Sequence, residues 1–413
     1  MKKLSYKKKF LTFFSGTIIA QIITIAAMPL LTRLYSTSDF GQYNLYLSLL
    51  AIFTVISTLR LEFAYNQAES NKEISGINRI IQFFSFYFSV ILFLFLLILS
   101  KINFIDLSIY FSLLLTISIF FQSINYSQTY LLNKIDDFNS LTKGKINKST
   151  VNVLSNAVIG KYKVIDSGLI ISNIISLISS NYYQRRSINT KFKKEYLSKN
   201  ELKEIFISYK DFPKYNIISS LFDTLALNLP FIIFTKFFGL ATTGAYGIAY
   251  RTVSMPISLI SQSIGQVFLN EISKKFKNGE NIINVIYKVS FLLAIIGFIP
   301  SIFLARYSPE LFTFIFGSEW IKSGQMLQII IFSLYLKFIV SPITNIYFII
   351  NKMSTLFKLQ MLRGISTFFI LIIGCIYFDI FTVLIIYTIH ECLFYILYYL
   401  NIVYICKSVY KNI

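Results

Sequence analysis

The chain has 413 residues, of which 55% are hydrophobic and 17% aromatic, and it carries a formal net charge of +20. Its mean hydropathy is +0.63, and only 14% of its residues are charged, whereas soluble domains contain about a quarter. These values exclude an ordinary soluble domain and predict a membrane protein. In a membrane protein, positive charge is expected mainly in the loops between spans. We therefore do not expect nucleic acid as a partner.

A membrane-spanning helix needs about 20 residues with few charges. Twelve stretches meet or approach this requirement. They are residues 10–32, 40–61, 80–100, 106–131, 147–161, 165–183, 214–236, 242–269, 282–304, 323–350, 356–378 and 380–405. The fifth is the most polar, so we expect other helices to bury it. The first is too long for a signal peptide, and we interpret it as an uncleaved span.

The distribution of Lys and Arg predicts the orientation of these spans, because basic residues accumulate in cytoplasmic loops. With the N-terminus inside, 27 of the 39 basic residues fall on the cytoplasmic side, seven outside and five within spans. Both termini are therefore predicted to be cytoplasmic.

An internal repeat divides the chain. Residues 32–46 (TRLYSTSDFGQYNLY) have an echo at residues 235–249 (TKFFGLATTGAYGIA), at an offset of 203. The sequence therefore predicts an all-α membrane protein with about 12 transmembrane helices in two pseudo-symmetric six-helix lobes, residues 1–183 and 214–413. Between them lies a basic cytoplasmic linker, residues 184–213, which we expect to form a surface helix on anionic membrane lipids or to remain a solvated connection.

Ionisable residues inside spans are candidates for function because each costs several kcal/mol unless it faces a cavity or a partner. Four are cations: Arg60, Arg251, Lys337 and Arg363. Together with stripes of Ser, Thr, Asn and Gln, they predict a cation-bearing cavity for an anionic cargo such as a phosphate or pyrophosphate. Alternatively, they pair internally, as Arg251 would with Asp223, or reach the headgroups, as Arg60 and Lys288 would.

The remaining intramembrane candidates are Asp223, His390 and Glu391, which would serve ion or proton coupling or simply hydrogen-bond a neighbouring helix. No cofactor or metal is expected, since the three cysteines have no metal-ligand spacing. No P-loop, HExxH motif or external pair of carboxylates is present, so we do not expect an enzyme.

The basic N-terminal tail, Ser15-Gly16, the stretch LLTRLYSTSDFGQYNLY and FGSEW at residues 316–320 together resemble the oligosaccharide flippases of bacterial polysaccharide biosynthesis, in the multidrug/oligosaccharidyl-lipid/polysaccharide exporter superfamily. The resemblance implies flipping of undecaprenyl-pyrophosphate-linked repeat units of O-antigen or capsule across the bacterial cytoplasmic membrane by alternating access. It also implies cavity cations, with a polysaccharide polymerase and a chain-length regulator as partners.

Three alternatives remain open. A lipid II flippase usually carries two further spans, and a multidrug exporter of the same superfamily prefers an acid-rich cavity. A membrane polysaccharide polymerase would place a large catalytic loop outside, whereas the longest loop here is basic and predicted to be cytoplasmic.

The orientation can be tested with a topology reporter fused after Lys194, in the linker. We expect a cytoplasmic signal, because residues 184–215 carry nine Lys or Arg and such loops are retained inside. A fusion after Lys163 is the control and should report from the outside. An external signal after Lys194 would reverse the orientation.

Overall fold

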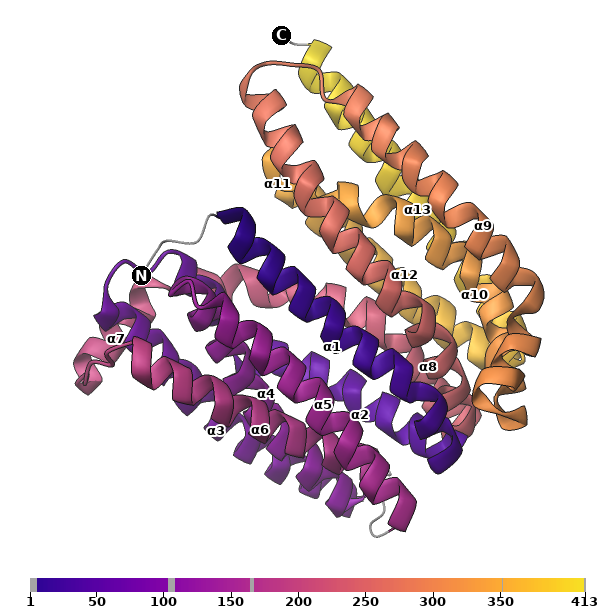
Figure 1. Ribbon diagram of the computed structural model, residues 1–413, viewed down its shortest axis with the longest axis horizontal. Coiled ribbons are helices and arrows are strands. Elements are labelled where there is room, and N and C mark those ends of the chain that lie inside the picture. The colour runs from indigo at the N-terminus through magenta and orange to yellow at the C-terminus, as the bar shows by residue number, and fades with distance from the viewer. Residues whose placement is uncertain (1–5, 103–107, 164–166, 351, 412–413) are drawn as a thin grey trace. The chain divides into compact units, whose positions relative to one another are not determined.

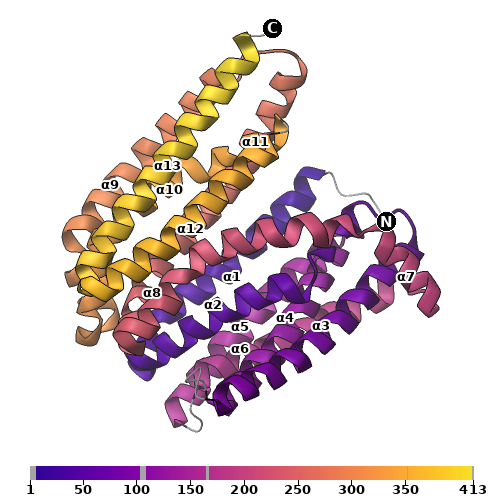
Figure 2. The same cartoon turned by 180° about the vertical axis from the view of Figure 1, so that it is seen from behind.

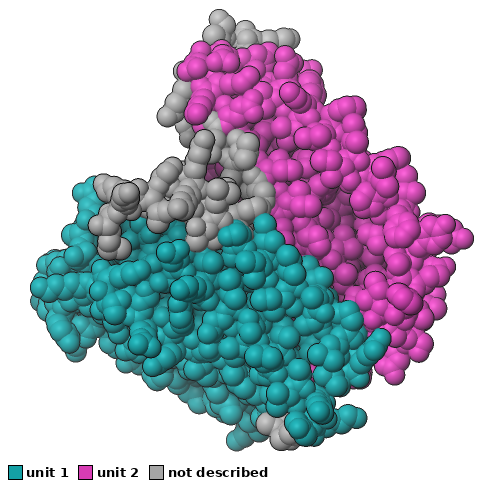
Figure 3. Space-filling model, in the orientation of Figure 1, with its two compact units in different colours: residues 1–34, 45–228 teal, residues 35–44, 229–413 magenta. Residues whose placement is uncertain are grey.

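The computed structural model describes residues 6–102, 108–163, 167–350 and 352–411, and every regular element in these ranges is helical (Figure 1). The chain folds as two compact units, drawn in different colours in Figure 3. Unit 1 comprises residues 1–34 and 45–228, and unit 2 comprises residues 35–44 and 229–413. The all-helical prediction is thus confirmed for the described residues.

Unit 1 contains a bundle in which α5 packs against both α1 and α6, while α4 packs against α3 and α6. Figures 1 and 2 both show α3, α4, α5 and α6 running alongside one another. The elements are α1 (Tyr6–Leu34), most of α2 (Thr37–Ser57), η1 (Leu61–Asn66), α3 (Asn71–Lys101), α4 (Ile109–Lys134), α5 (Phe138–Tyr162), α6 (Gly168–Lys191), α7 (Lys199–Ser208), η2 (Phe212–Asn216) and the start of α8 (Ile217–Lys277).

Unit 2 is organised around α10, which packs against α9 and α13, and α13 also packs against α12. Besides the remainder of α8, it contains α9 (Ile283–Phe316), η3 (Ser318–Trp320), α10 (Ile321–Val340), η4 (Ser341–Asn345), α11 (Ile346–Ile349), α12 (Met353–Tyr377) and α13 (Ile380–Lys411). Its core includes Phe268, Ile286, Tyr347 and Ile402, which are almost completely buried.

Nine helices among the described residues are long and apolar enough to cross a membrane. This number is smaller than twelve for two reasons. The seventh and eighth predicted spans are two helices that share the label α8 and meet at a kink at Gly239. This residue has a φ of 80°, a conformation that glycine adopts without strain. Helices α5 and α6 match the fifth and sixth predicted spans, but they are too polar to be counted among these nine.

The predicted start of the fifth span, residue 147, is wrong by nine residues. Helix α5 begins at Phe138, and the Asp137 side chain caps it by accepting a hydrogen bond from the Ser140 backbone N–H at 3.3 Å. Capping of this kind satisfies a backbone donor that the first turn leaves free. The predicted start left Lys145 outside the fifth span, whereas it lies inside the helix together with Lys148.

Several polar side chains of α4 form hydrogen bonds with neighbouring helices of unit 1. The Asn125 amide donates to the Ser180 hydroxyl at 3.0 Å and to Asn181 Oδ1 at 2.9 Å, while the hydroxyls of Ser57 and Ser123 lie 2.6 Å apart. Such bonds are expected where a bilayer offers no water to polar groups. These residues hold α2, α4 and α6 together rather than lining an open space.

The two copies of the repeated stretch pack directly against each other within unit 2. A Cβ added at Gly41 would overlap the carbonyl of Leu240, and one added at Gly244 would overlap the carbonyl of Thr37. At the offset of 203, Gly41 corresponds to Gly244 and Thr37 to Leu240. The two close approaches are therefore equivalent halves of one two-fold contact.

The Gly244→Ala substitution should destabilise unit 2, because the added methyl group meets backbone that cannot turn aside. We expect a loss of about 1–3 kcal/mol, seen as a lower midpoint of thermal unfolding in detergent. The symmetry predicts a similar loss for Gly41→Ala. Gly374→Ala is the control, since its Cβ would first meet Val383 Cγ2 at 3.4 Å. Equal midpoints for all three variants would contradict the close packing.

Candidate functional site

Arg251 lies on α8, beyond the kink at Gly239, in a half-buried position. Its Nε donates a hydrogen bond to Asn44 Oδ1 at 2.6 Å, and its guanidinium carbon lies 5.4 Å from the centroid of the Phe231 ring. Gly247, one turn earlier on α8, leaves room for the Asn44 side chain, which any Cβ at that position would overlap. The repeated stretch thus supplies the residue that positions the arginine.

Lys337 lies in the last turn of α10 and meets the same aromatic group. Its Nζ donates to the Tyr250 hydroxyl at 2.9 Å and lies 5.3 Å from the centroid of that ring. Tyr250 stacks on Tyr246 with ring centroids 6.0 Å apart, and the rings of Phe231 and Tyr250 form a T-shaped pair whose centroids are also 6.0 Å apart. Arg251 and Lys337 therefore flank one cluster of three aromatic rings.

Neither of these two cations forms an ion pair with a described residue; their polar partners are the neutral Asn44 and Tyr250. Neutral acceptors and aromatic faces hold a cation in place without cancelling its charge. A charge at this depth in a span is costly unless it serves a cavity or a pathway. The arrangement is suited to an anion, which Arg can bind through two hydrogen bonds and Lys as a point charge.

Arg363, also predicted to bind the cargo, is neutralised by a residue that was predicted for ion coupling. Its Nε donates to Glu391 Oε1 at 3.1 Å and its Nη2 to Oε2 at 2.5 Å. Nη2 also donates to the Tyr395 hydroxyl at 3.2 Å, and both charged side chains are at least 93% buried. The geometry of this pair between α12 and α13 is bidentate, which is the strong form of such contacts.

His390 joins the edge of this ion pair. Its Nε2 lies 2.8 Å from the Ser366 hydroxyl, and its Nδ1 lies 3.6 Å from Glu391 Oε1. The structure therefore brings together three of the predicted residues, Arg363, His390 and Glu391, in a buried network that ties α12 to α13.

Two predicted residues lie in unit 1. Asp223 is half-buried near the start of α8. Arg60 precedes η1 with a φ of 53°, and its Nη1 lies 3.2 Å from Glu62 Oε1. Glu62 is completely buried, and this burial raises the pKa of its carboxyl while Arg60 opposes the increase. Arg60 thus has an acidic partner of its own.

Sequence reasoning missed two cations on α5. Lys145 Nζ donates to the Thr17 hydroxyl at 3.0 Å, and Lys148 Nζ donates to Gln122 Oε1 at 3.3 Å. Their spacing of three residues, which places them on one helix face, and the capping signal at Asp137 are the features that would have revealed them.

The long apolar helices of the described residues are those of a multi-pass membrane protein. Residues 30–325, more than half of the chain, match the family described as "Polysaccharide biosynthesis protein". The chain belongs to this family.

A curated relative is the teichuronic acid biosynthesis protein TuaB of Bacillus subtilis (strain 168). It is 22% identical over 234 residues, which are 55% of this chain and 47% of that protein. The chain thus spans about half the length of the curated relative that it matches.

Solved structures show the same fold at low sequence identity. The lipid II flippase MurJ in its inward closed conformation gives a TM-score of 0.71 at 16% identity, covering 95% of this chain and 87% of that one. An inward-facing multidrug resistance MATE family transporter of the MOP superfamily gives 0.65 at 13% identity, covering 100% and 97%. A MOP superfamily transporter from Pyrococcus furiosus gives 0.61 at 12% identity, covering 97% and 96%.

Removing one member of the buried ion pair should lower the stability of the fold more than removing both. Glu391→Leu leaves Arg363 buried without a counter-charge, and the expected loss is about 3–5 kcal/mol. The double variant Arg363→Met with Glu391→Leu should recover most of that loss. Thermal unfolding of purified protein in detergent measures both. A double variant that is less stable than either single variant would exclude a direct pair.

Proposed function

We propose that this protein is a flippase that moves undecaprenyl-pyrophosphate-linked oligosaccharide repeat units from the cytoplasmic to the outer leaflet of the bacterial cytoplasmic membrane by alternating access. The repeat units would belong to O-antigen, capsule or a related surface polysaccharide. Membership of the polysaccharide biosynthesis family supports the glycan, and the fold, which the chain shares with a lipid II flippase, supports the movement of a lipid-linked cargo.

The observation that carries this proposal is the pair of cations without acidic partners in the described part of unit 2. Arg251 and Lys337 are held by Asn44 and Tyr250, which leave both positive charges available. A pyrophosphate offers several acceptor oxygens, so it would engage the guanidinium through two hydrogen bonds and the ammonium through charge. The positive charge of Arg363 is balanced by Glu391. We therefore assign this ion pair a structural role, in which it holds α12 against α13.

The negative charge of the proposed cargo also matches the positive charge of the site. A drug cation would be repelled by two positive charges that no acid offsets, whereas a pyrophosphate is attracted. Flipping requires no bond to be made or broken, so no catalytic residue is assigned. A polysaccharide polymerase and a chain-length regulator would act on the units delivered to the outer leaflet.

The variants Arg251→Ala and Lys337→Ala should each reduce translocation by at least tenfold, since a hydrogen bond to a charged group contributes about 1.5–3 kcal/mol. The measurement is the amount of surface polysaccharide, together with the leaflet location of the undecaprenyl-linked glycan in cells with intact synthesis. We expect the glycan to accumulate on the cytoplasmic face.

Lys288→Ala is the matched control, because Lys288 is an exposed lysine within the membrane-spanning helix α9. It should leave the polymer unchanged at equal protein levels. Lys337→Arg should retain activity. This result would show that the positive charge at position 337 is required and that the shape of the lysine side chain is not. Normal polymer in both alanine variants would refute the site. Unpolymerised units on the outer face of cells lacking the protein would refute flipping and favour a role in polymerisation.

A further inference from the structure

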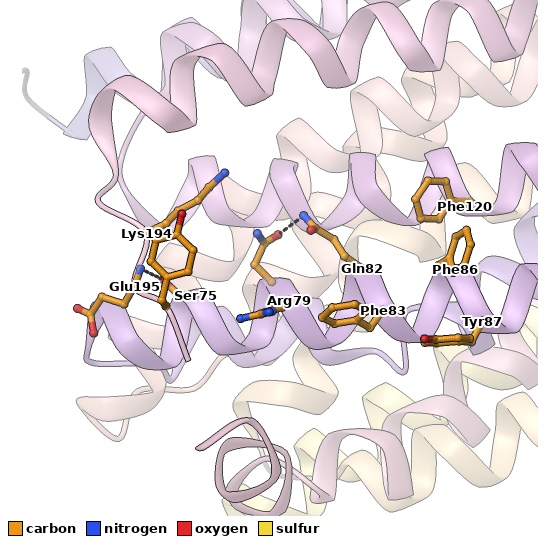
Figure 4. Close-up of a pocket in the computed structure, with 11 residues that line it drawn as sticks. Ser75, Arg79, Gln82, Phe83, Phe86, Tyr87, Phe120, Lys194 and Glu195 are labelled. Atoms are coloured by element: carbon orange, nitrogen blue, oxygen red, sulfur yellow. Dashed lines mark hydrogen bonds between the residues drawn. The ribbon is translucent and has the colours of Figure 1, made fainter. Parts of the chain in front are cut away.

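A cavity of about 620 Å³ lies on unit 1 where α3 and α4 meet the segment that follows α6. Its wall changes character along its length, as Figure 4 shows: Arg79 and Lys194 lie toward one end, and Phe83, Phe86, Tyr87 and Phe120 lie toward the other. We propose that this cavity binds one anionic phospholipid of the surrounding membrane. Its phosphate would lie at the cations and an acyl chain along the aromatic rings.

The charged end carries positive charge that no described acid offsets. Arg79 Nη1 donates to the Leu197 carbonyl at 3.1 Å, and Lys194 Nζ donates to Asn189 Oδ1 at 2.8 Å, so both partners are neutral. Burial, together with the nearby Arg185, lowers the pKa of Lys194, which is the effect expected where cations gather without a counter-ion. Glu195 also lines the cavity, but its carboxylate points away from Arg79 in Figure 4.

The apolar end belongs to the surface of a membrane-spanning helix. Phe83, Phe86 and Tyr87 on α3 are 48%, 50% and 60% exposed, and the ring of Phe86 lies 5.8 Å from that of Phe120 on α4. From Arg79 to Tyr87 the helix rises about 12 Å. A ligand that fills the cavity must therefore join an anionic head to an apolar tail, which describes a phospholipid and not a free phosphate.

A second cavity of about 280 Å³ continues from the charged end, since the two share Asn78, Gln82, Phe120 and Lys194 as lining residues. It is also lined by Gln128, whose side-chain oxygen is buried without a hydrogen-bond partner in the described part of the chain. A buried acceptor of this kind favours a ligand with a hydroxyl donor. The glycerol headgroup of phosphatidylglycerol supplies both the hydroxyls and the negative charge.

The cavity wall includes the start of the linker, which is fastened to α3 by several bonds. The Glu195 backbone N–H donates to the Ser75 hydroxyl at 3.1 Å, and Lys72 pairs with Glu201 at 2.7 Å, a contact that lowers the pKa of the Glu201 carboxyl to about 2. Ile205 of α7 packs where Gly76 has no side chain. A phosphate bridging Arg79 on α3 and Lys194 on the linker would add a further tie, so the bound lipid would hold the linker on unit 1.

The test is a binding titration of the full-length protein, purified in detergent, with phosphatidylglycerol and with phosphatidylcholine, read by native mass spectrometry. We expect saturable binding of phosphatidylglycerol alone, weakened by salt. Arg79→Ala and Lys194→Ala should each raise the dissociation constant about tenfold, as the loss of a charge-assisted contact does. Lys193→Ala removes the same charge from an exposed neighbour outside the cavity lining and should have no effect.

Four results would overturn the proposal. Equal weakening by Lys193→Ala and Lys194→Ala would show that only general positive charge matters. Equal binding of phosphatidylcholine would show that the lipid's net negative charge is not recognised. Displacement of the lipid by millimolar inorganic phosphate would remove any role for the aromatic end. Displacement of phosphatidylglycerol by a lower concentration of undecaprenyl phosphate would show that the cavity binds undecaprenyl phosphate instead. Unfolding midpoints of the variants, measured alongside, separate lost binding from lost folding.

Discussion

The absence of water from the bilayer core is the constraint on which the rest of this structure depends. Polar groups in a span are therefore stabilised by partners inside the protein. Unit 1 supplies hydrogen bonds such as those of Asn125 to Ser180 and Asn181, and unit 2 supplies the ion pair of Arg363 and Glu391. Arg251 and Lys337 differ because their polar partners, Asn44 and Tyr250, are neutral.

The helical class and most helix positions followed from the sequence because apolar runs about 20 residues long have few alternatives in a membrane. The boundaries that failed depend on single residues. The connection between the seventh and eighth spans is present, but it is a kink at a single glycine with positive φ. A capping aspartate starts α5 before the predicted span, so that Lys145 lies inside the helix. Hydropathy averages over a window and cannot register either effect.

The candidate site was predictable as a set of residue types but not as a set of partnerships. Span positions identified Arg251, Lys337, Arg363 and Glu391 individually, yet nothing in the sequence shows that Arg363 faces Glu391 across two helices while Lys337 faces Tyr250. Such pairings depend on how each helix is rotated about its axis. The structure therefore adds the partners that the sequence did not show: an acid for Arg363 and neutral groups for Arg251 and Lys337.

The two-fold contact between Gly41 with Leu240 and Gly244 with Thr37 has a consequence for the history of the chain. In an isologous contact the same residues serve on both sides, so a half-length ancestor carrying this stretch once would have needed a second copy of itself to complete the contact. Gene duplication and fusion would then preserve an interface that already existed. After fusion the two copies would have been free to diverge. Position 251 now holds an arginine, whereas its equivalent in the earlier copy, at the offset of 203, is Ser48. On this account the cationic site arose when the two copies became different at position 251, while both kept the glycine of the two-fold contact.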